Sequence, residues 1–409
     1  MRLLFIGLNY APELVGIGPY TAGIAEALAD QGHEVRVICG QPYYPEWKKR
    51  RGYKGWSTGR ENGVTVSRCP HFVPSDPTGP KRIFHLLSFA MAAILPAISQ
   101  LRFRPDIVLA VVPTLAALPL AILLARLTGA KLWVHVQDFE AQAAEATGLL
   151  RREGLVARLA HSCEGWLLRR ADMVSSISPQ MCARLFEIGI APERVYELRN
   201  WSNHMAAFMR PASGDYRFEW NLGERRVVLY SGNIANKQGL EMVIEAARLL
   251  AGRKDLVFLI CGNGPSRPSL ERRAEGLENV QFHDLQPAER IGELLSLAAL
   301  HVLPQIEAAA DLVLPSKLAN MLASGRPVIV TADEDTGLAS EIAGCGLAVP
   351  PGDPQKLADA ITKLLESPVA AEAMGREAER RAYERWSFDR IFASAEREFY
   401  RLTGAPARG

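Results

Sequence analysis

Short apolar runs rich in β-branched residues alternate along this chain with longer stretches of helical periodicity. This alternation predicts βαβ units with buried, parallel strands. This alternation of predicted strands and helices occurs in two successive series. The first series of predicted strands covers residues 3–7, 34–38, 107–112, 132–136 and 173–176, and the second covers 227–230, 257–261, 280–283, 300–303 and 328–331.

Helical periodicity is lost between the two series. Residues 198–212, which include Trp201 and Pro211, have the composition of a connector. We therefore expect a Rossmann-like domain at 1–204, a second at 205–385, and a terminal amphipathic helix at 386–409 that packs back on the N-terminal domain. The predicted fold class is α/β, with two doubly wound domains facing across a cleft, because open α/β sheets bind ligands at the carboxyl ends of their strands.

Residues 107–125 carry no charge, and that length is sufficient to cross a bilayer. However, Pro113 and Pro119 interrupt the run, and its first six residues are rich in β-branched side chains. A buried strand followed by a core helix fits this pattern better than a membrane span. The first ten residues likewise fit a strand and not a signal peptide.

Composition narrows the functional classes. With 409 residues, 48% hydrophobic and 22% charged, the chain has enough apolar surface for two cores. The net charge of +2 gives no reason to expect a nucleic-acid partner, although the basic excess falls in the first half. Six cysteines without a Cys-x-x-Cys pair predict reduced thiols and a cytoplasmic location.

Two groups of residues in the N-terminal half are candidates for a site. Gly16 and Gly18 precede a helix whose N-terminus suits phosphate or developing negative charge, although a tight turn without a ligand also explains them. His135 and Asp138 lie at the end of a predicted strand, where they would bind a sugar hydroxyl or carry a proton. The alternative for His135 is a core histidine, since Val134 and Val136 flank it.

The C-terminal half repeats a strand followed by a glycine-containing loop. Candidate phosphate-binding groups are Asn233, Lys237, Gly262, Asn263, Gly264, Ser316, Lys317, Leu318 and Asn320. Lys237 in a loop and Lys317 in the first turn of a helix suit a diphosphate, and the backbone N–H groups of that turn add to the site. A solvated loop charge and an ordinary capped helix are the alternatives. Phe282 and His283 end a strand and are expected beside a nucleobase.

Several other site types are not expected. The histidine and cysteine spacings fit no transition-metal site, and neither a P-loop nor a Gly-x-Ser-x-Gly motif is present. Asp333, Glu334 and Asp335 would suit a divalent cation, but such a run is more often a solvated loop. We therefore expect no metal and no resident cofactor.

Seven strings spread over nearly the whole chain are characteristic: NYAPE at 9–13, GIG at 16–18, PYYPEW at 42–47, HVQDFE at 135–140, YSGN at 230–233, KQG at 237–239 and DLVLPSKL at 311–318. In these strings the chain resembles the GT-B glycosyltransferases of glycosyltransferase family 4, especially those of colanic acid and related exopolysaccharide synthesis. The resemblance implies a retaining, metal-independent transfer of a hexosyl group, such as fucosyl, from a UDP- or GDP-linked sugar. It also implies that the C-terminal domain binds the donor and the N-terminal domain the acceptor.

The chain departs from the family pattern at three positions. Leu312 and Asn320 stand where many members have two glutamates, one of which binds the ribose, and Asn233 stands where many have arginine. We therefore expect Lys237 and Lys317 to hold the diphosphate with less help. The N–H groups near Ser316 and Gly18 would assist them, while His135 and Asp138 orient the sugar or the acceptor.

Basic and apolar residues occur together in the net-positive half, at residues 81–91 and 48–51. This combination suits an anionic membrane and a polyprenyl-diphosphate-linked acceptor, with an oligosaccharide as the other acceptor class. The alternative is a buried helix with ordinary charged ends. Two other functions fit the same architecture, a nucleotide-sugar epimerase and a non-catalytic nucleotide-sugar-binding subunit.

Overall fold

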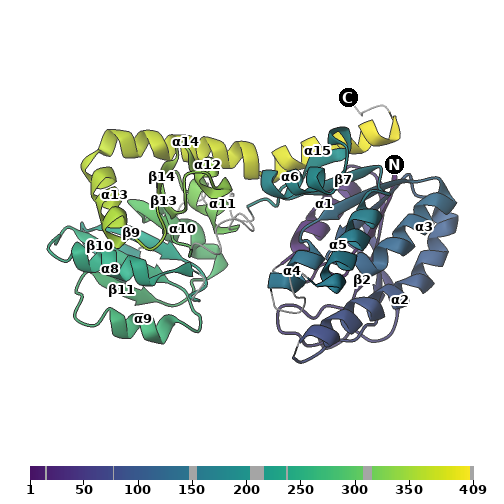
Figure 1. Cartoon of the computed structure of the whole chain (residues 1–409), viewed down its shortest axis with the longest axis horizontal. Helices are drawn as coiled ribbons and strands as arrows, with labels where there is room; N and C mark the ends of the chain where they lie inside the picture. The colour runs from purple at the N-terminus through teal and green to yellow at the C-terminus, as the bar shows by residue number, and fades with distance from the viewer. Residues whose placement is uncertain are drawn as a thin grey trace. The chain divides into compact units, whose positions relative to one another are not determined.

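The computed structural model describes residues 1–13, 16–76, 78–146, 154–202, 216–235, 238–306 and 316–405. Contacts divide the chain into two compact units, which Figure 1 shows. Unit 1 consists of Met1–Arg199 and Phe392–Gly409, and unit 2 of Asn200–Ile391. The end of the chain therefore belongs to the same unit as its beginning.

Unit 1 is built on a sheet that has eight strands within the described residues, in the order β3-β4-β2-β1-β5-β6-β7-β8. All neighbouring pairs are parallel except β3 and β4. The strands are β1 (Arg2–Ile6), β2 (Glu34–Gly40), β3 (Ser57–Glu61), β4 (Val64–Cys69), β5 (Ile107–Val112), β6 (Lys131–Val136), β7 (Met173–Ser176) and β8 (Val195–Glu197).

Helices cover both faces of this sheet (Figure 1). The helices are α1 (Gly18–Asp30), α2 (Gly79–Phe103), η1 (Leu115–Ala117), α3 (Leu118–Thr128), α4 (Glu140–Ala146), α5 (Leu155–Leu168), α6 (Pro179–Glu187), η2 (Pro192–Arg194) and α15 (Phe388–Thr403). One face packs on α2, α3, α5 and α6. On the other face, the ring of Phe399 in α15 lies 4.7 Å from that of Trp133 in β6, so the terminal helix covers the sheet of unit 1.

Unit 2 has a parallel sheet of six strands in its described part, in the order β11-β10-β9-β12-β13-β14. The strands are β9 (Arg226–Ser231), β10 (Leu256–Cys261), β11 (Val280–His283), β12 (Leu300–Leu303), β13 (Val328–Thr331) and β14 (Gly346–Val349). The helices are α7 (Tyr216–Glu219), α8 (Glu241–Leu249), α9 (Arg267–Arg273), η5 (Ala288–Arg290), α10 (Ile291–Ser296), α11 (Ser316–Ala323), α12 (Gly337–Ile342), α13 (Pro354–Glu366) and α14 (Pro368–Trp386).

The two series of predicted strands are confirmed as two Rossmann-like sheets. The uncharged run after residue 106 is a fully buried strand, β5, followed by η1 and α3, as its prolines and β-branched residues indicated. Four strands were not predicted: β3, β4, β8 and β14. The connector predicted at 198–212 is described only as far as Ser202.

Within the part of the chain that the structure describes, one helix, α2, is long and apolar enough to cross a membrane. Core helices of ordinary domains share this length and hydropathy, so these two properties do not decide between the possibilities. Phe89, Ala93 and Phe103 on one side of α2 are buried against the sheet of unit 1, whereas only 33% of its most apolar 18-residue window is buried.

Candidate active site

Unit 1 contains a cavity of about 810 Å³ at the carboxyl ends of its central strands. The neighbours β1 and β5 form the point where the strand order reverses, and parallel α/β sheets bind ligands there. Asn9 and Ile17 line the cavity after β1, Leu115 after β5, and Asp138 after β6. Most of the remaining lining is apolar or aromatic, and includes Tyr43, Tyr44, Trp47, Leu86, Leu87 and Leu167.

Three carboxylates and one guanidinium are the charged groups of this cavity. Asp138, Glu140, Glu164 and Arg82 all line it. An Oε1 of Glu140 accepts a hydrogen bond from the Leu115 N–H at 2.6 Å, and the Glu140 N–H donates to Glu164 at 3.0 Å. Desolvation, together with the nearby charges of Glu164 and Asp138, raises the pKa of Glu140 to about 7. Desolvation also raises the pKa of Asp138. Such groups suit the hydroxyls of a sugar.

His135 does not reach this cavity. His135 belongs to β6 and is buried, with 5% of its surface exposed. Its Nδ1 atom lies 2.9 Å from Ser175 Oγ, and its Nε2 atom lies 3.0 Å from the Gln137 amide nitrogen. Burial lowers the pKa of His135 to about 4, so the ring is neutral near pH 7. The structure therefore places His135 as a hydrogen-bonded core histidine, because alternation along β6 turns its side chain into the protein. Asp138 is the member of the predicted pair that lies in the cavity.

Gly16 lines the cavity, whereas Gly18 is buried at the start of α1. The loop that carries them is fixed by Glu13, whose buried carboxylate accepts hydrogen bonds from the N–H groups of Tyr43 and Tyr44 and from the amide of Asn9. Desolvation by burial raises the pKa of Glu13. Glu13 thus joins the loop after β1 to the loop after β2.

In unit 2, two loops leave the carboxyl ends of β9 and β10 and pack directly on each other. The N–H of Ile234 donates to the carbonyl of Asn263 at 2.9 Å. A Cβ on Gly262 would lie 1.8 Å from the Gly232 carbonyl oxygen, and one on Gly264 would lie 2.1 Å from the Ile234 carbonyl oxygen. The contact between the two backbones therefore requires these glycines. The side chains of Asn233 and Asn263 are exposed at the same edge of the sheet.

Lys317 lies over the first of these loops. Its Nζ atom is 2.7 Å from the Tyr230 hydroxyl, which itself donates to the Asn233 carbonyl oxygen at 2.5 Å. A Cβ on Gly232 would lie 2.2 Å from Cε of Lys317 and 2.4 Å from its Nζ. Glycine at this position therefore makes room for the ammonium group. The order of this sheet reverses between β9 and β12, and Lys317 contacts Tyr230 of β9, so it lies near the position at which parallel α/β sheets generally bind ligands.

The other predicted residues of this helix are placed differently. Leu318 is fully buried in the core, so only its backbone is available to a ligand. The side chain of Asn320 accepts a hydrogen bond from the hydroxyl of Ser202. Ser316 begins α11. Lys237 and Leu312 lie outside the described residues, and so does the side chain of Ser316.

Phe282 and His283 end β11, as predicted, but each has a partner within unit 2. Phe282 is partly buried against the core. The His283 ring stacks on Trp220, with 3.8 Å between the ring centres and 15° between the planes. The stacking fixes the orientation of the imidazole at the edge of the sheet.

Two family profiles together match most of the chain. The "Glycosyl transferase 4-like domain" matches residues 15–201, and "Glycosyl transferases group 1" matches residues 225–367. The chain is also 44% identical over 347 residues to WcaI of Escherichia coli (strain K12), named as a glycosyl transferase of colanic acid biosynthesis. This match covers 83% of this chain and 85% of WcaI. The chain belongs to the family 4 glycosyltransferases. It is a glycosyltransferase with the GT-B arrangement of two Rossmann-like sheets.

Solved structures agree on the fold of this glycosyltransferase. Sucrose-phosphate synthase from Thermosynechococcus elongatus has a TM-score of 0.74 at 18% identity, covering 99% of this chain and 100% of that one. HepE of Anabaena, solved in complex with UDP, has a TM-score of 0.70 at 16% identity, covering 98% and 100%. At these identities the likeness concerns the fold alone.

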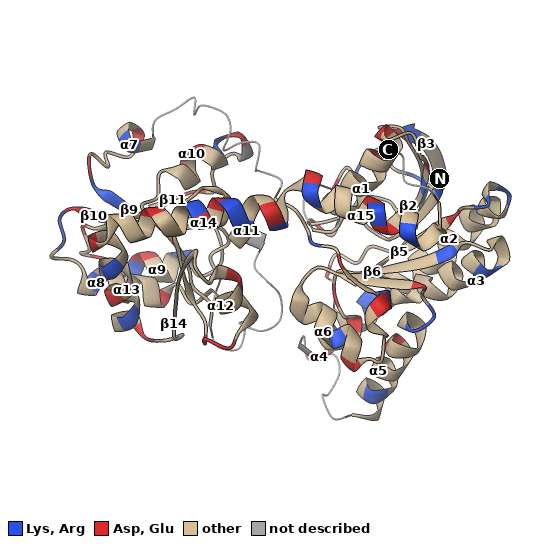
Figure 2. Ribbon diagram, turned by 90° about the horizontal axis from the view of Figure 1, so that it is seen from above, with Lys and Arg blue, Asp and Glu red and all other residues tan. Residues whose placement is uncertain are grey.

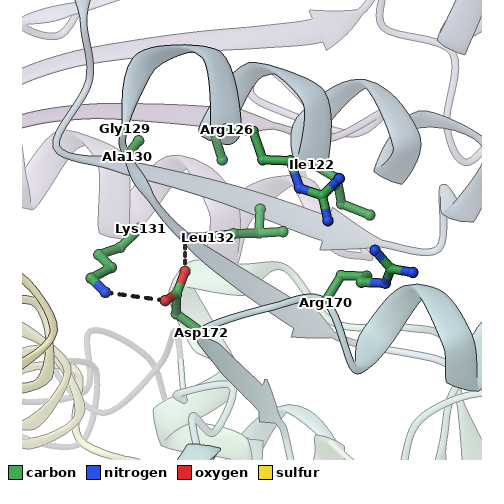
Figure 3. A pocket seen from close by; sticks show the side chains of 9 residues that line it. Ile122, Arg126, Gly129, Ala130, Lys131, Leu132, Arg170 and Asp172 are labelled. Atoms are coloured by element: carbon green, nitrogen blue, oxygen red, sulfur yellow. Dashed lines mark hydrogen bonds and ion pairs between the residues drawn. The ribbon is translucent and has the colours of Figure 1, made fainter.

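A second cavity of the glycosyltransferase, of about 200 Å³, lies at the opposite edge of the unit 1 sheet. It is lined by the amino-terminal end of β6 and the end of α3, and there Lys131 and the Leu132 N–H both bond to the carboxylate of Asp172 (Figure 3). Arg126 and Arg170 lie on the other side of this cavity (Figure 3). Its position away from the carboxyl ends of the strands separates it from the candidate active site.

No group of three His, Cys, Asp or Glu side chains suited to a metal occurs among the residues that the structure describes. Asp333, Glu334 and Asp335 are exposed in the loop after β13. Sequence reasoning missed Glu164, Arg82 and Glu13 as parts of the site. Glu13 belonged to the string NYAPE and Arg82 to the basic and apolar stretch 81–91, which was singled out for membrane contact, whereas no sequence pattern pointed to Glu164.

Proposed function

We propose that this glycosyltransferase transfers a hexosyl group, such as fucosyl, from a UDP- or GDP-linked sugar with retention of configuration. The acceptor is a polyprenyl-diphosphate-linked or oligosaccharide intermediate of exopolysaccharide synthesis. The similarity to WcaI supports a place in the synthesis of colanic acid or a related polymer. The observation that carries the proposal is the ammonium group of Lys317 above Gly232, at the ligand-binding edge of unit 2.

In the proposed reaction, the bond between the anomeric carbon and the diphosphate oxygen breaks, and the acceptor hydroxyl oxygen forms a new bond on the same face of the sugar. The hydroxyl proton passes to the departing phosphate. Lys317 and Lys237 stabilise the negative charge of the leaving group, together with the N–H groups near Ser316. Asp138 and Glu140 orient the acceptor in the cavity of unit 1. The reaction requires no metal ion and no resident cofactor.

The two alternative functions are less well supported. WcaI, the relative reported above, is a glycosyl transferase by name, which favours transfer over epimerisation. A binding subunit without activity was motivated by the absence of two glutamates at Leu312 and Asn320. Since Asn320 is bonded to Ser202, its side chain has a role inside unit 2 that does not depend on a ribose.

A thermal-shift screen against UDP, GDP and their sugar conjugates tests the proposal, because a ligand that binds only the folded state raises Tm. We expect one nucleotide to raise Tm by several degrees in the wild type, and the shift to be lost in Lys317→Ala. Lys363→Ala, which removes an exposed lysine of α13, is the matched control. A wild type that no nucleotide stabilises would contradict the proposal.

A further inference from the structure

Helix α2 has one face buried in unit 1 and a second face that no described helix or strand of unit 1 covers. His85, Phe89, Ala93 and Ala97 lie on the buried side. The large apolar side chains on the exposed side are Ile83, Phe84, Leu87, Met91, Ile94, Leu95, Ile98 and Leu101, and we call this set the α2 ridge. Met91 is 68% exposed and Leu95 is 59% exposed. Burial of such side chains away from water is worth about 2 kcal/mol each, so the ridge favours an apolar environment.

The exposed side of α2 is also free of charge over this length. Its exposed charged residues are Lys81 and Arg82 before the ridge and Arg102 after it, and the helix contains no acidic residue. By contrast, α14 in unit 2 carries both signs of charge along its length (Figure 2). An ordinary surface helix resembles α14, whereas α2 has the pattern of a helix that meets an apolar phase.

A basic loop lies beside the ridge. The Nε1 of Trp56 donates a hydrogen bond to the Ala92 carbonyl oxygen at 2.9 Å, which attaches the segment before β3 to the middle of α2. That segment contains Lys48, Lys49, Arg50, Arg51 and Lys54, all of which are exposed. Trp56 itself is 55% exposed, and tryptophan is favoured at the boundary between lipid and water.

The ridge continues into the cavity of unit 1. Ile83 and Leu87 belong to the ridge and also line the cavity, next to Arg82. An apolar chain lying along the ridge would therefore reach the cavity without crossing a polar surface. This continuity matters for an acceptor carried on a lipid, because the lipid would otherwise have to leave the membrane.

We propose that the α2 ridge lies in the surface of an anionic phospholipid bilayer, parallel to the membrane plane, with the loop 48–54 on the anionic headgroups. This inference rests on the proposed function in one respect: of the two acceptor classes proposed there, the lipid-linked acceptor is the one that enters the cavity. Charge complementarity favours a bilayer over a second copy of the chain. Antiparallel pairing of two α2 helices would bring Lys81 and Arg82 of one copy against Arg102 of the other.

Flotation with defined vesicles tests the inference. Wild-type protein is mixed with vesicles of phosphatidylcholine alone or with 30% phosphatidylglycerol, at low and high salt. We expect binding to the anionic vesicles that is weakened by salt, because Lys and Arg near the surface contribute to it. The variant Met91→Glu/Leu95→Glu should bind at least tenfold more weakly, and Lys48→Glu/Lys49→Glu should bind severalfold more weakly. Val369→Glu, at an even more exposed apolar position of α14, should bind like wild type.

Three results would overturn the inference. They are the absence of wild-type binding to anionic vesicles, equal binding by Met91→Glu/Leu95→Glu, and a wild-type dimer in light scattering that this variant converts to a monomer. Neither Met91 nor Leu95 lines the cavity, so the nucleotide-induced rise in Tm should be the same in the variant and the wild type. If no nucleotide raises the Tm of the wild type, the proposed donor site is contradicted and the membrane inference is not. The two proposals are therefore tested separately.

Discussion

The Nζ atom of Lys317 lies 2.7 Å from the hydroxyl of Tyr230 and 4.6 Å from the centre of its ring. The tyrosine therefore holds the ammonium group above Gly232 through a hydrogen bond and through the face of its ring. Because burial raises the pKa of Tyr230, the hydroxyl stays neutral, and it accepts from Lys317 while it donates to Asn233.

Substitution of this pair should weaken donor binding in two steps. Lys317→Ala removes the charged group that we propose binds the diphosphate, so we expect the affinity for the nucleotide diphosphate and kcat/KM to fall about 100-fold. Tyr230→Phe leaves the lysine in place but removes its oxygen partner, so a loss of about 3- to 10-fold is expected. Isothermal titration and initial rates measure both. A larger effect from Tyr230→Phe than from Lys317→Ala would contradict the assignment of the charge to Lys317.

Substitutions of Lys237 and His135 should differ in their effects, with Lys237 affecting turnover and His135 affecting stability. Lys237→Ala should lower turnover far more than His135→Ala, with little change in the free energy of unfolding. His135→Ala removes a buried, hydrogen-bonded ring and should cost about 2–4 kcal/mol of that free energy, measured by urea denaturation. Comparable losses of turnover in the two variants, at a temperature where both are folded, would show that this ranking is wrong.

Glu140 should make unit 1 less stable as the pH rises. Its pKa is raised to about 7 in the folded protein, so the folded state holds a proton that the unfolded state releases near pH 4.5. The contribution of Glu140 to the free energy of unfolding is fully present below pH 4.5 and is lost as the pH rises through about 7. The total loss is at most about 3 kcal/mol. In Glu140→Gln this part of the pH dependence should vanish. Thermal melts between pH 5 and 8 measure it, and an unchanged profile in the variant would assign the effect to other groups.

A single added methyl group should disrupt the contact between the loops after β9 and β10 of unit 2. Gly262→Ala places Cβ against the Gly232 carbonyl and should cost about 2 kcal/mol or more, together with a loss of nucleotide binding. Gly276 also has a positive φ, of 81°, but a Cβ there meets nothing within 4 Å. Gly276→Ala is therefore the matched control, and only the backbone cost of about 1 kcal/mol is expected. Equal losses in the two variants would show that the loop contact is not what requires Gly262.

Cys163 provides a probe of the cavity in unit 1. It lines the cavity and is exposed, whereas the other five cysteines are buried. A maleimide should therefore label Cys163 first, and an excess of a polyprenyl phosphate should slow the labelling several-fold if the cavity binds such a chain. Cys163→Ser identifies the labelled thiol by mass spectrometry. Labelling that the lipid does not slow would count against the cavity as the acceptor site.

The strand pattern predicted the two sheets because buried parallel strands are continuous apolar runs. The hairpin of β3 and β4 was missed for a physical reason. β3 reads STGRE, an exposed edge strand without apolar alternation, although Asn62-Gly63 between the strands is a strong hairpin signal. β8 covers only three residues, VYE, which include a charged one. β14 reads GLAV and is as long as strands that were predicted, but its glycine and the two prolines that follow it are typical of a loop.

The sequence predicted those residues of the candidate site that lie just after a strand or at the start of a helix. Asp138 and Lys317 lie directly after buried strands or in the first turn of a helix, so their positions were readable from local sequence. Glu164 and Arg82 belong to helices far along the chain, and only tertiary packing brings them to the cavity. The orientation of His135 was open in the sequence, because both of its neighbours are valines and the face that it occupies depends on the register of β6.

Unit 1 is assembled from the two ends of the polypeptide, since α15 returns to cover Trp133 and Thr403 approaches Met1. During synthesis, the sheet of unit 1 emerges from the ribosome first, but the helix that shields one of its faces is translated only after all of unit 2. The nascent chain thus carries an uncovered tryptophan and its apolar neighbours throughout the translation of its second half. The face of unit 1 that α15 covers is thus completed only after unit 2 has been synthesised, and chaperone binding to nascent chains should be longest at this face.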